Sequence, residues 1–346
     1  MKHPLWEFTQ VRFLEFIRDP EAIFWVFVFP VILALVLGTA FKNPQNAEIR
    51  VAVTGVEAQN LAARLSSSGS HVKAVVMGRD EAYAALRSGR ADLLARAESG
   101  SPSRVVFRFD PARPGSREAR LLADKALQES FGRKDKIAIA SEESREKGGR
   151  YIDFLIPALI GLNIMGGCMW GMGYAIVDFR RKKLIKRFAV TPMHRSHFLL
   201  AFVLSRVAFV LVEAGLLLGF GILVFGFTLF GSLAAFAVVC VLTLAAFAGI
   251  ALLIAARATS TESASGWMNL VQVPMWLFSG SFFSNTRFPD AFQPAIRLLP
   301  LTAFNDAARA ILNEGASLAS VTPQCILLAA WGCLGFFLAL KIFRWQ

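Results

Sequence analysis

The feature that most constrains this chain is a short basic stretch, residues 178–200, between two long apolar runs. Against the single acid Asp178 it holds seven cations: Arg180, Arg181, Lys182, Lys183, Lys186, Arg187 and Arg195. Lysine and arginine concentrate in the short cytoplasmic loops of membrane proteins. Residues 178–198 are therefore predicted to form a cytoplasmic loop, which fixes the orientation of the runs on either side.

Apolar residues in the same loop suggest a second role. Leu184, Ile185 and Phe188 recur with the spacing of one helical face, so a short helix here carries an apolar stripe among its cations. Thr191-Pro192 ends that helix, because proline lacks the backbone N–H and disfavours helix at the residue before it. Two interpretations remain open: the loop is a topology anchor, or it is a docking element for a cytoplasmic partner.

The composition indicates a membrane protein. Of the 346 residues, 55% are hydrophobic and only 18% are charged. Much of the excess charge behind the net +12 lies in the membrane-flanking loop, so we expect membrane lipids of the anionic inner leaflet as its counterpart, and no nucleic acid. The four cysteines lie in apolar runs without a CxxC pair, which predicts neither a disulfide framework nor a zinc site.

The apolar runs predict six transmembrane helices. About 20 apolar residues in a helix cross the hydrocarbon core of a bilayer. The expected spans are residues 21–41, 151–177, two that share 198–256 and fold back near Gly231, then 267–284 and 321–340. Residues 151–346 then form a five-helix transmembrane domain. The lysine and arginine counts in the short segments predict a multi-pass protein of the cytoplasmic (inner) membrane with both termini in the cytoplasm.

Two segments beside the spans predict helices that lie in the membrane interface. Residues 1–20 form an amphipathic cytoplasmic helix with Phe13 and Ile17 on its apolar half. Residues 285–320 are too polar to span and predict outer interfacial helices. Within the first span, Pro30 is expected to produce a kink.

Residues 42–150 contain no spanning run and have the pattern of a small α/β domain. Alternating strand-like segments at 49–54, 72–77 and 105–110 are interleaved with helix-like stretches, and the length is normal for one domain. Because this segment follows a span that leaves the cytoplasm, we expect it to be extracytoplasmic. The predicted fold is thus an α-helical membrane protein with six transmembrane helices and an α/β domain inserted between the first two.

Polar residues within the predicted spans are candidate functional groups. Arg206 and Glu213 are seven residues apart and share a helix face. Arg206 is near the cytoplasmic end, where it can snorkel toward water, whereas Glu213 is deeper, where an acid is a functional candidate by default. Asn269 and Gln272 are expected to be polar packing groups.

The chain lacks the motifs of a catalytic or nucleotide site. It contains no GxxxxGK[ST] phosphate loop, GxGxxG, HExxH or GxSxG, so no catalytic, cofactor-binding or metal-binding residue is predicted. His194 and His197 lie among cations, which disfavour a bound metal ion. Uphill transport would draw its energy from a partner or an ion gradient. Gly167 and Gly171 form a GxxxG pair, which permits close helix packing within the chain or across a dimer.

These features resemble the permease subunits of type 2 ABC exporters over nearly the whole chain. An interfacial helix ending in Arg18-Asp19-Pro20 precedes a first span with Pro30, and an external α/β domain follows. The more specific features are the loop that ends in Thr191-Pro192 and the late stretch Leu299-Pro300-Leu301-Thr302 with Asp306 and Arg309. Where many relatives have a Glu-rich, Gly-containing start to the loop, this chain has Asp178 followed by RRKK, which leaves the subfamily and substrate open.

The resemblance implies a subunit that pairs with a second permease chain, as a homodimer or a heterodimer, and with two cytoplasmic ATP-binding cassette subunits, which bind and hydrolyse the ATP. The implied transport is outward, of an unidentified drug, lipid or polysaccharide-like substrate. In such exporters the interfacial helix and the loop after the second span contact the ATPase. The implied coupling residues are therefore Leu184, Ile185, Phe188, Lys182, Lys183, Phe13 and Ile17.

Two other classes of membrane protein are alternatives to a permease subunit. A membrane-anchored sensor or assembly scaffold would use the external domain to bind a ligand. An ion-coupled transporter would show inverted repeats with broken helices at the midplane, and the sequence has no such symmetry.

Overall fold

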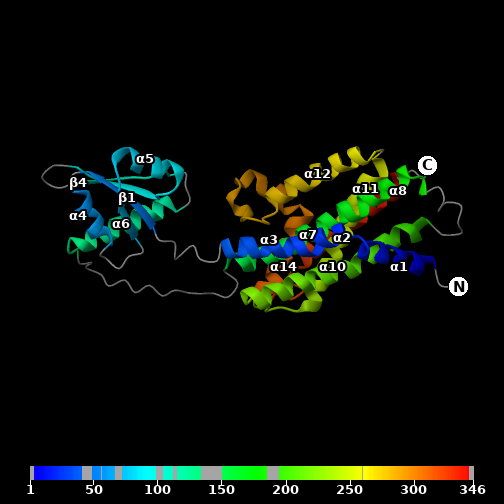
Figure 1. Cartoon of the computed structure of the whole chain (residues 1–346). Helices are drawn as coiled ribbons and strands as arrows, with labels where there is room; N and C mark the ends of the chain where they lie inside the picture. The colour runs from blue at the N-terminus through cyan, green and yellow to red at the C-terminus, as the bar shows by residue number, and fades with distance from the viewer. Residues whose placement is uncertain are drawn as a thin grey trace. The chain divides into compact units, whose positions relative to one another are not determined.

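The computed structural model describes residues 4–40, 49–55, 57–66, 72–98, 104–111, 115–133, 150–184, 195–258 and 260–342 (Figure 1). The chain divides into two compact units, one of residues 43–144 and one of residues 1–42 with 145–346.

The smaller unit is a four-stranded sheet with three helices. Its strands, in the order β2-β1-β3-β4, are β2 (Val72–Val76), β1 (Ile49–Gly55), β3 (Leu93–Glu98) and β4 (Arg104–Arg108). Strand β1 is parallel to both β2 and β3, whereas β3 and β4 are antiparallel. Helices α4 (Ala58–Ser66) and α6 (Ser116–Ser130) pack on one face, and α5 (Arg79–Ser88) packs on the other (Figure 1).

The sequence pattern did not predict strand β3. Its residues, LLARAE, are leucine, alanine and charged residues without the β-branched side chains that favour strands. The strand is held by tertiary context, because Leu93 and Ala95 are buried against α4 and α6 while Leu94 is buried on the α5 side. Burial on both faces marks β3 as a central strand, which periodicity alone does not distinguish from other apolar runs.

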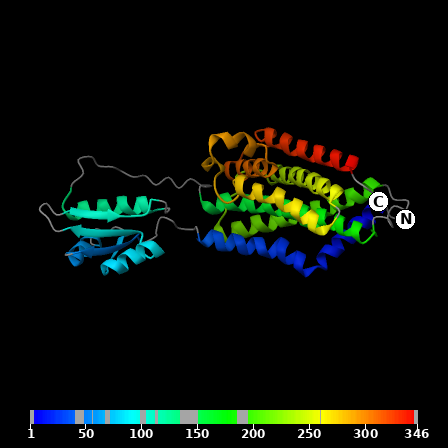
Figure 2. The same ribbon diagram turned by 90° about the horizontal axis from the view of Figure 1, so that it is seen from above.

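The larger unit is a bundle of helices (Figure 2). In chain order its elements are α1 (Pro4–Ile17), α2 (Pro20–Ile23), the π-helix η1 (Phe24–Val28), α3 (Phe29–Ala40), α7 (Tyr151–Gly166), the π-helix η3 (Gly167–Gly173), α8 (Tyr174–Arg181), α10 (Arg195–Phe225), α11 (Leu233–Arg257), α12 (Thr261–Phe278), η4 (Asn285–Arg287), η5 (Asp290–Phe292), α13 (Gln293–Arg297), α14 (Pro300–Glu314) and α15 (Thr322–Ile342).

Five helical segments of the described chain are long and apolar enough to cross a membrane. They are Pro20–Ala40, Tyr151–Arg181, Ala201–Phe225, Leu233–Arg257 and Thr322–Ile342. The protein is thus a helical, multi-pass membrane protein with a small sheet unit. The predicted span at 267–284 is not among the five. Its helix, α12, instead begins at Thr261, six residues before the predicted start, because Ser260 accepts a hydrogen bond from the backbone N–H of Ser263 and caps the helix there.

Helix α12 nevertheless lies alongside the other long helices of the bundle (Figures 1 and 2). Just before it, the carbonyl of Ala258 accepts a hydrogen bond of 3.1 Å from Arg180 at the end of α8. Just after it, the carbonyl of Gly280 accepts one of 2.6 Å from Arg309, which also donates to the carbonyl of Phe154 near the start of α7. Two opposite ends of the bundle therefore flank α12.

The prediction of interfacial helices at 285–320 needs one correction. Helix α14 does not lie on the surface of the bundle, because Leu301, Phe304 and Ile311 are fully buried against α7, α11 and α15. Arg309 lies over the ring of Phe154, with 3.6 Å from its guanidinium carbon to the ring centroid. Burial lowers the pKa of Arg309 to about 10, an effect that Asp306 opposes, so the guanidinium stays charged at neutral pH.

Two prolines inside the spans leave carbonyls that asparagine amides satisfy. Pro157 has no N–H to donate to Asp153, four residues earlier in α7, and the Asp153 carbonyl accepts a 2.9 Å hydrogen bond from Asn313 Nδ2 of α14. Pro30 similarly has no N–H for Val26, whose carbonyl accepts one of 3.0 Å from Asn163 Nδ2 of α7. The disturbance expected at Pro30 thus takes the form of the π-helix η1, which directly precedes α3.

Candidate functional site

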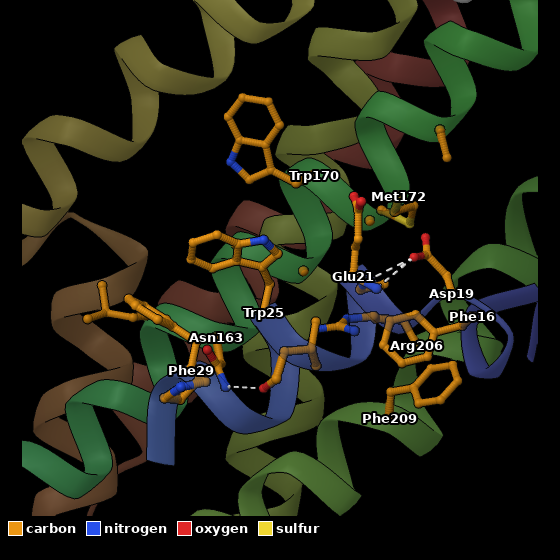
Figure 3. A pocket seen from close by; sticks show the side chains of 18 of the residues that line it. Phe16, Asp19, Glu21, Trp25, Phe29, Asn163, Trp170, Met172, Arg206 and Phe209 are labelled. Atoms are coloured by element: carbon orange, nitrogen blue, oxygen red, sulfur yellow. Dashed lines mark hydrogen bonds between the residues drawn. The ribbon is translucent and has the colours of Figure 1, made fainter. Parts of the chain in front are cut away.

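A cavity of about 940 Å³ lies within the helical unit. Its walls come from α1, the first span, α7 with η3, α10 and α12 (Figure 3). Most of its lining is aromatic or aliphatic, with a small number of charged and amide groups, as is usual for sites that bind organic ligands.

Two π-helices face this cavity from different spans. Trp25 and Val26 belong to η1, and Trp170 and Met172 belong to η3. A π-turn widens the helix and leaves backbone carbonyls without their usual donors, and such turns are frequent at functional sites. At η1 the freed Val26 carbonyl accepts the Asn163 amide, a contact drawn in Figure 3. The irregular backbone of both spans therefore borders the same space.

An ordered polar contact joins the second span to α12 across the cavity wall. The indole N–H of Trp170 donates a 2.9 Å hydrogen bond to Gln272 Oε1. Gln272 is buried and lines the cavity, whereas Asn269, the other polar residue predicted on this helix, is exposed and does not line it. The third cavity tryptophan, Trp276, follows Gln272 by one helical turn.

A buried ion pair lies on α10, and its arginine forms part of the cavity wall. Arg206 Nη2 lies 2.9 Å from a carboxylate oxygen of Glu213, and the two residues are only 6% and 2% exposed. Arg206 therefore does not snorkel to the surface, as its position near the helix end had suggested, but lines the cavity. The pairing follows from the seven-residue spacing, which places both side chains on one face of α10.

One glycine of the GxxxG pair in the second span, Gly167, makes room for this arginine. A Cβ at Gly167 would lie 1.7 Å from Arg206 Nη2, so only glycine leaves space for the guanidinium there. Gly171 meets nothing within 4 Å and is exposed. Within this chain the GxxxG pair thus makes room for the Arg206 side chain at Gly167, and does not bring two helix backbones into contact.

Helix α1 contributes Arg12, Glu15 and Phe16 to the wall of the cavity. Phe13 and Phe16 pack on Phe209 of α10, with ring centroids 4.8 and 4.2 Å apart. Arg12 lies over the ring of Phe202 at 4.2 Å and forms a 2.6 Å ion pair with Glu15. Burial lowers the pKa of Arg12, and Glu15 opposes that shift.

The residues that the sequence predicted for partner coupling fall into three groups. Ile17 is exposed on α1, and Phe13 is half covered by Phe209. Lys182 and Lys183 are exposed after α8, with Lys182 2.7 Å from Asp178, and Leu184 is partly buried. Ile185 and Phe188 lie outside the described residues. Arg12, over the ring of Phe179 at 5.4 Å, joins α1 to α8 at this end.

Sequence reasoning missed most of the cavity. Trp25, Trp170, Trp276 and Asn163 were not singled out, because lone aromatic and amide residues in a span look like ordinary membrane packing. The available signals were the prolines at 30 and 157, each of which leaves a carbonyl in need of a donor, and the glycine-rich second span.

A bundle with five helical segments long and apolar enough to cross a membrane defines a class, the multi-pass membrane proteins. A family model described as "ABC-2 family transporter protein" matches residues 20–341. Nodulation protein J of Rhizobium meliloti (strain 1021) is 30% identical over 203 residues, which are 58% of this chain and 76% of that protein. "Inner membrane transport permease YhhJ" of Escherichia coli (strain K12) is 30% identical over 173 residues, or 50% of this chain and 46% of that protein.

The chain belongs to the ABC-2 family of transporter proteins, as a transmembrane permease subunit. The match confirms the resemblance drawn from the sequence. The part of this chain that aligns with the Escherichia coli permease covers 46% of that protein's length.

Proposed function

We propose that this chain is the permease subunit of an ATP-driven exporter of the cytoplasmic membrane, and that the cavity holds its substrate on the way outward. The observation that carries the proposal is the cavity itself, which lies between the first span, η3, α10 and α12 and has α1 as part of its wall. In a permease driven by a separate ATPase, movement of α1 would change the wall of the substrate site directly.

The proposed topology has six spans, which are the five apolar segments given above and α12. The residues just before and just after α12 are linked through Arg180 and Arg309 to opposite ends of the second span, which supports this count. The lower hydropathy of α12 follows from the polar residues of its first turns and from Gln272, which points inward. Both termini and the 178–198 loop would then be cytoplasmic, and residues 43–144 would be extracytoplasmic. A cysteine at Ser99 should react with an impermeant thiol reagent in intact cells, and one at Ser196 should not.

The proposed ATP-binding partner would contact α1 and the start of the basic loop. Family membership implies such a partner, and we propose two copies. Arg12 joins α1 to α8 through its contact with Phe179. The exposed Ile17 is on α1, and the exposed Lys182 and Lys183 directly follow α8, so one docking surface could include all three. Charged groups at such a surface mainly speed association, and the apolar ones supply affinity.

A second permease chain is proposed on the side where α3 and α12 border the cavity. Ile32 and Val36 of α3 and Leu270 and Leu277 of α12 are exposed large apolar side chains of these two helices. Differently tagged copies of the chain that co-purify would support a homodimer. The sensor or scaffold alternative has less support, because the large cavity lies in the helical unit.

The decisive experiment is co-purification with an ATP-binding cassette protein encoded in a neighbouring reading frame, followed by ATP hydrolysis in lipid. Replacing Leu184 and Phe188 with Ser keeps all seven loop cations, so insertion should be unchanged. Each buried apolar side chain contributes about 1.5–3 kcal/mol, so ATPase association should weaken at least tenfold, roughly 1.4 kcal/mol. Lys182 and Lys183 to Gln is the matched pair, which keeps the apolar stripe and should mainly slow association, by a factor that depends on the salt concentration. If the Ser pair binds the ATPase like the parent, the loop is an anchor and Phe13 and Ile17 become the next candidates.

A further inference from the structure

We infer that the cavity binds an amphipathic organic cation with aromatic groups, and that Glu21, together with the indoles of Trp25 and Trp170, recognises its charge. The inference rests on the proposed function, because it names the substrate class of the cavity proposed there.

The charges of the cavity lining leave carboxylates in excess. Five charged side chains line it, and both cations are already paired, Arg12 with Glu15 at 2.6 Å and Arg206 with Glu213 at 2.9 Å. The Asp19 carboxylate accepts from the backbone N–H groups of Glu21 and Ala22, as the N-cap of α2. Glu21 is the remaining acid, and its side chain has no ion pair or hydrogen bond among the described residues.

The aromatic lining adds a second source of attraction for positive charge. Trp25 of η1, Trp170 of η3 and Trp276 of α12 reach the cavity from three different elements. Figure 3 shows the Trp25 and Trp170 indoles with Glu21 in the same view of the cavity. The face of an indole attracts a cation, and aromatic side chains with a nearby carboxylate are the common recognition pattern for quaternary ammonium groups.

Other ligand chemistries fit less well. An anion would meet two arginines that already have carboxylate partners, and Arg206 would have to leave Glu213 inside an apolar wall. A neutral glycan would find few hydrogen-bonding groups among the aromatic residues. A small inorganic cation keeps its water and gains little from indoles. A bulky, delocalised cation gives up little hydration, and 940 Å³ is enough for a drug-sized molecule.

The test uses two ions of the same shape and opposite charge, tetraphenylphosphonium and tetraphenylborate. Their dissociation constants are measured by equilibrium dialysis against the purified full-length chain in a non-ionic detergent, with empty micelles as the blank. Glu21→Gln should weaken phosphonium binding about tenfold, roughly 1.4 kcal/mol, and should not weaken borate binding. Trp25→Leu should weaken phosphonium binding about fivefold. Glu7→Gln removes an exposed carboxylate of α1 outside the cavity and should change neither.

The outcomes separate cleanly. Equal losses for both ions in Glu21→Gln would mean that the cavity selects bulk and not charge, and would overturn the inference. Borate binding that weakens in Arg206→Met while phosphonium binding does not would reassign the site to anions. The thermal midpoint of Glu21→Gln should match the parent, since the side chain is exposed. The binding assay contains no ATPase, so it is independent of the co-purification experiment. If the chain binds phosphonium but recruits no ATP-binding subunit, the exporter proposal is wrong and the cation site remains.

Discussion

The two sides of the helical bundle are held together in opposite ways. On one side, α11 and α15 approach backbone to backbone, so that a Cβ at Gly335 would lie 2.7 Å from the carbonyl carbon of Gly249. On the other side, the first span, η3 and α12 stand around the cavity. There the contacts are polar: Asn163 to Val26, and Trp170 to Gln272.

The difference shows which packing contacts the helices of a membrane bundle lose when they surround a cavity. Small residues let helices gain dispersion contacts along their length, but only where nothing separates them. Helices that border an open space lose those contacts, and longer polar side chains bridge the gap. Hydrogen bonds in an apolar interior stabilise strongly only while each group keeps its partner. We therefore expect the packed side to fail through steric overlap and the cavity side to fail through lost partners.

The largest effect is expected when the ion pair on the cavity side is broken. Arg206→Met leaves Glu213 buried without its partner, and removing one member of a buried pair costs about 3–5 kcal/mol. The thermal unfolding midpoint of the purified protein in detergent should fall accordingly. The double variant with Glu213→Gln should recover at least half of the loss. A double variant as unstable as the single one would show that the charge of Glu213 is not the cause.

The packed side should respond to a single methyl group. Gly335→Ala places a carbon against the backbone of Gly249, which no side-chain rotation relieves, and overpacking of this kind costs about 1–3 kcal/mol. Gly171→Ala is the matched change on the cavity side, where the new Cβ meets nothing within 4 Å. It should be neutral, or more stable by up to about 1 kcal/mol through helix propensity. Equal losses at the two positions would break the contrast between the sides.

The sequence predicted the contacts that follow from spacing along one helix. The basic loop, the long apolar runs and the shared face of Arg206 and Glu213 all depend on residues near in sequence, and the pair meets as that spacing requires. The family resemblance was likewise confirmed, because it rested on local motifs in a fixed order.

Contacts between segments that are far apart in the chain could not be predicted from the sequence. Nothing in a GxxxG pattern says that Gly167 faces an arginine 39 positions later and not another helix. The π-helices η1 and η3 depend on competition between hydrogen-bond registers within each span, and the cavity depends on both at once. The start of α12 was missed because a polar first turn that Ser260 caps looks like a loop.

The two asparagine amides offer a finer test, because the same device occurs on both sides of the bundle. Asn313→Ala leaves the Asp153 carbonyl without a donor in the packed part, at a cost of about 1–2 kcal/mol. Asn163→Ala does the same to the Val26 carbonyl, but water in the cavity can replace the amide, so the cost should be under about 1 kcal/mol. Thermal midpoints in detergent compare the two. A larger loss at Asn163 would mean that the cavity excludes water.

The smallest predicted effect asks whether the prolines are the reason for these amides. Pro157→Ala restores a backbone N–H that can donate to the Asp153 carbonyl, four residues earlier in α7. In that background Asn313→Ala should cost less than about 0.5 kcal/mol, because the carbonyl already has a partner. The four proteins of this cycle give a coupling energy that isolates the shared carbonyl from other effects of either change. Pro30→Ala with Asn163→Ala is the parallel cycle on the cavity side, where the coupling should be weaker since water competes. Additive losses in the Pro157 cycle would mean that Asn313 stabilises α14 for a reason other than the proline, and that the two sides do not share this device.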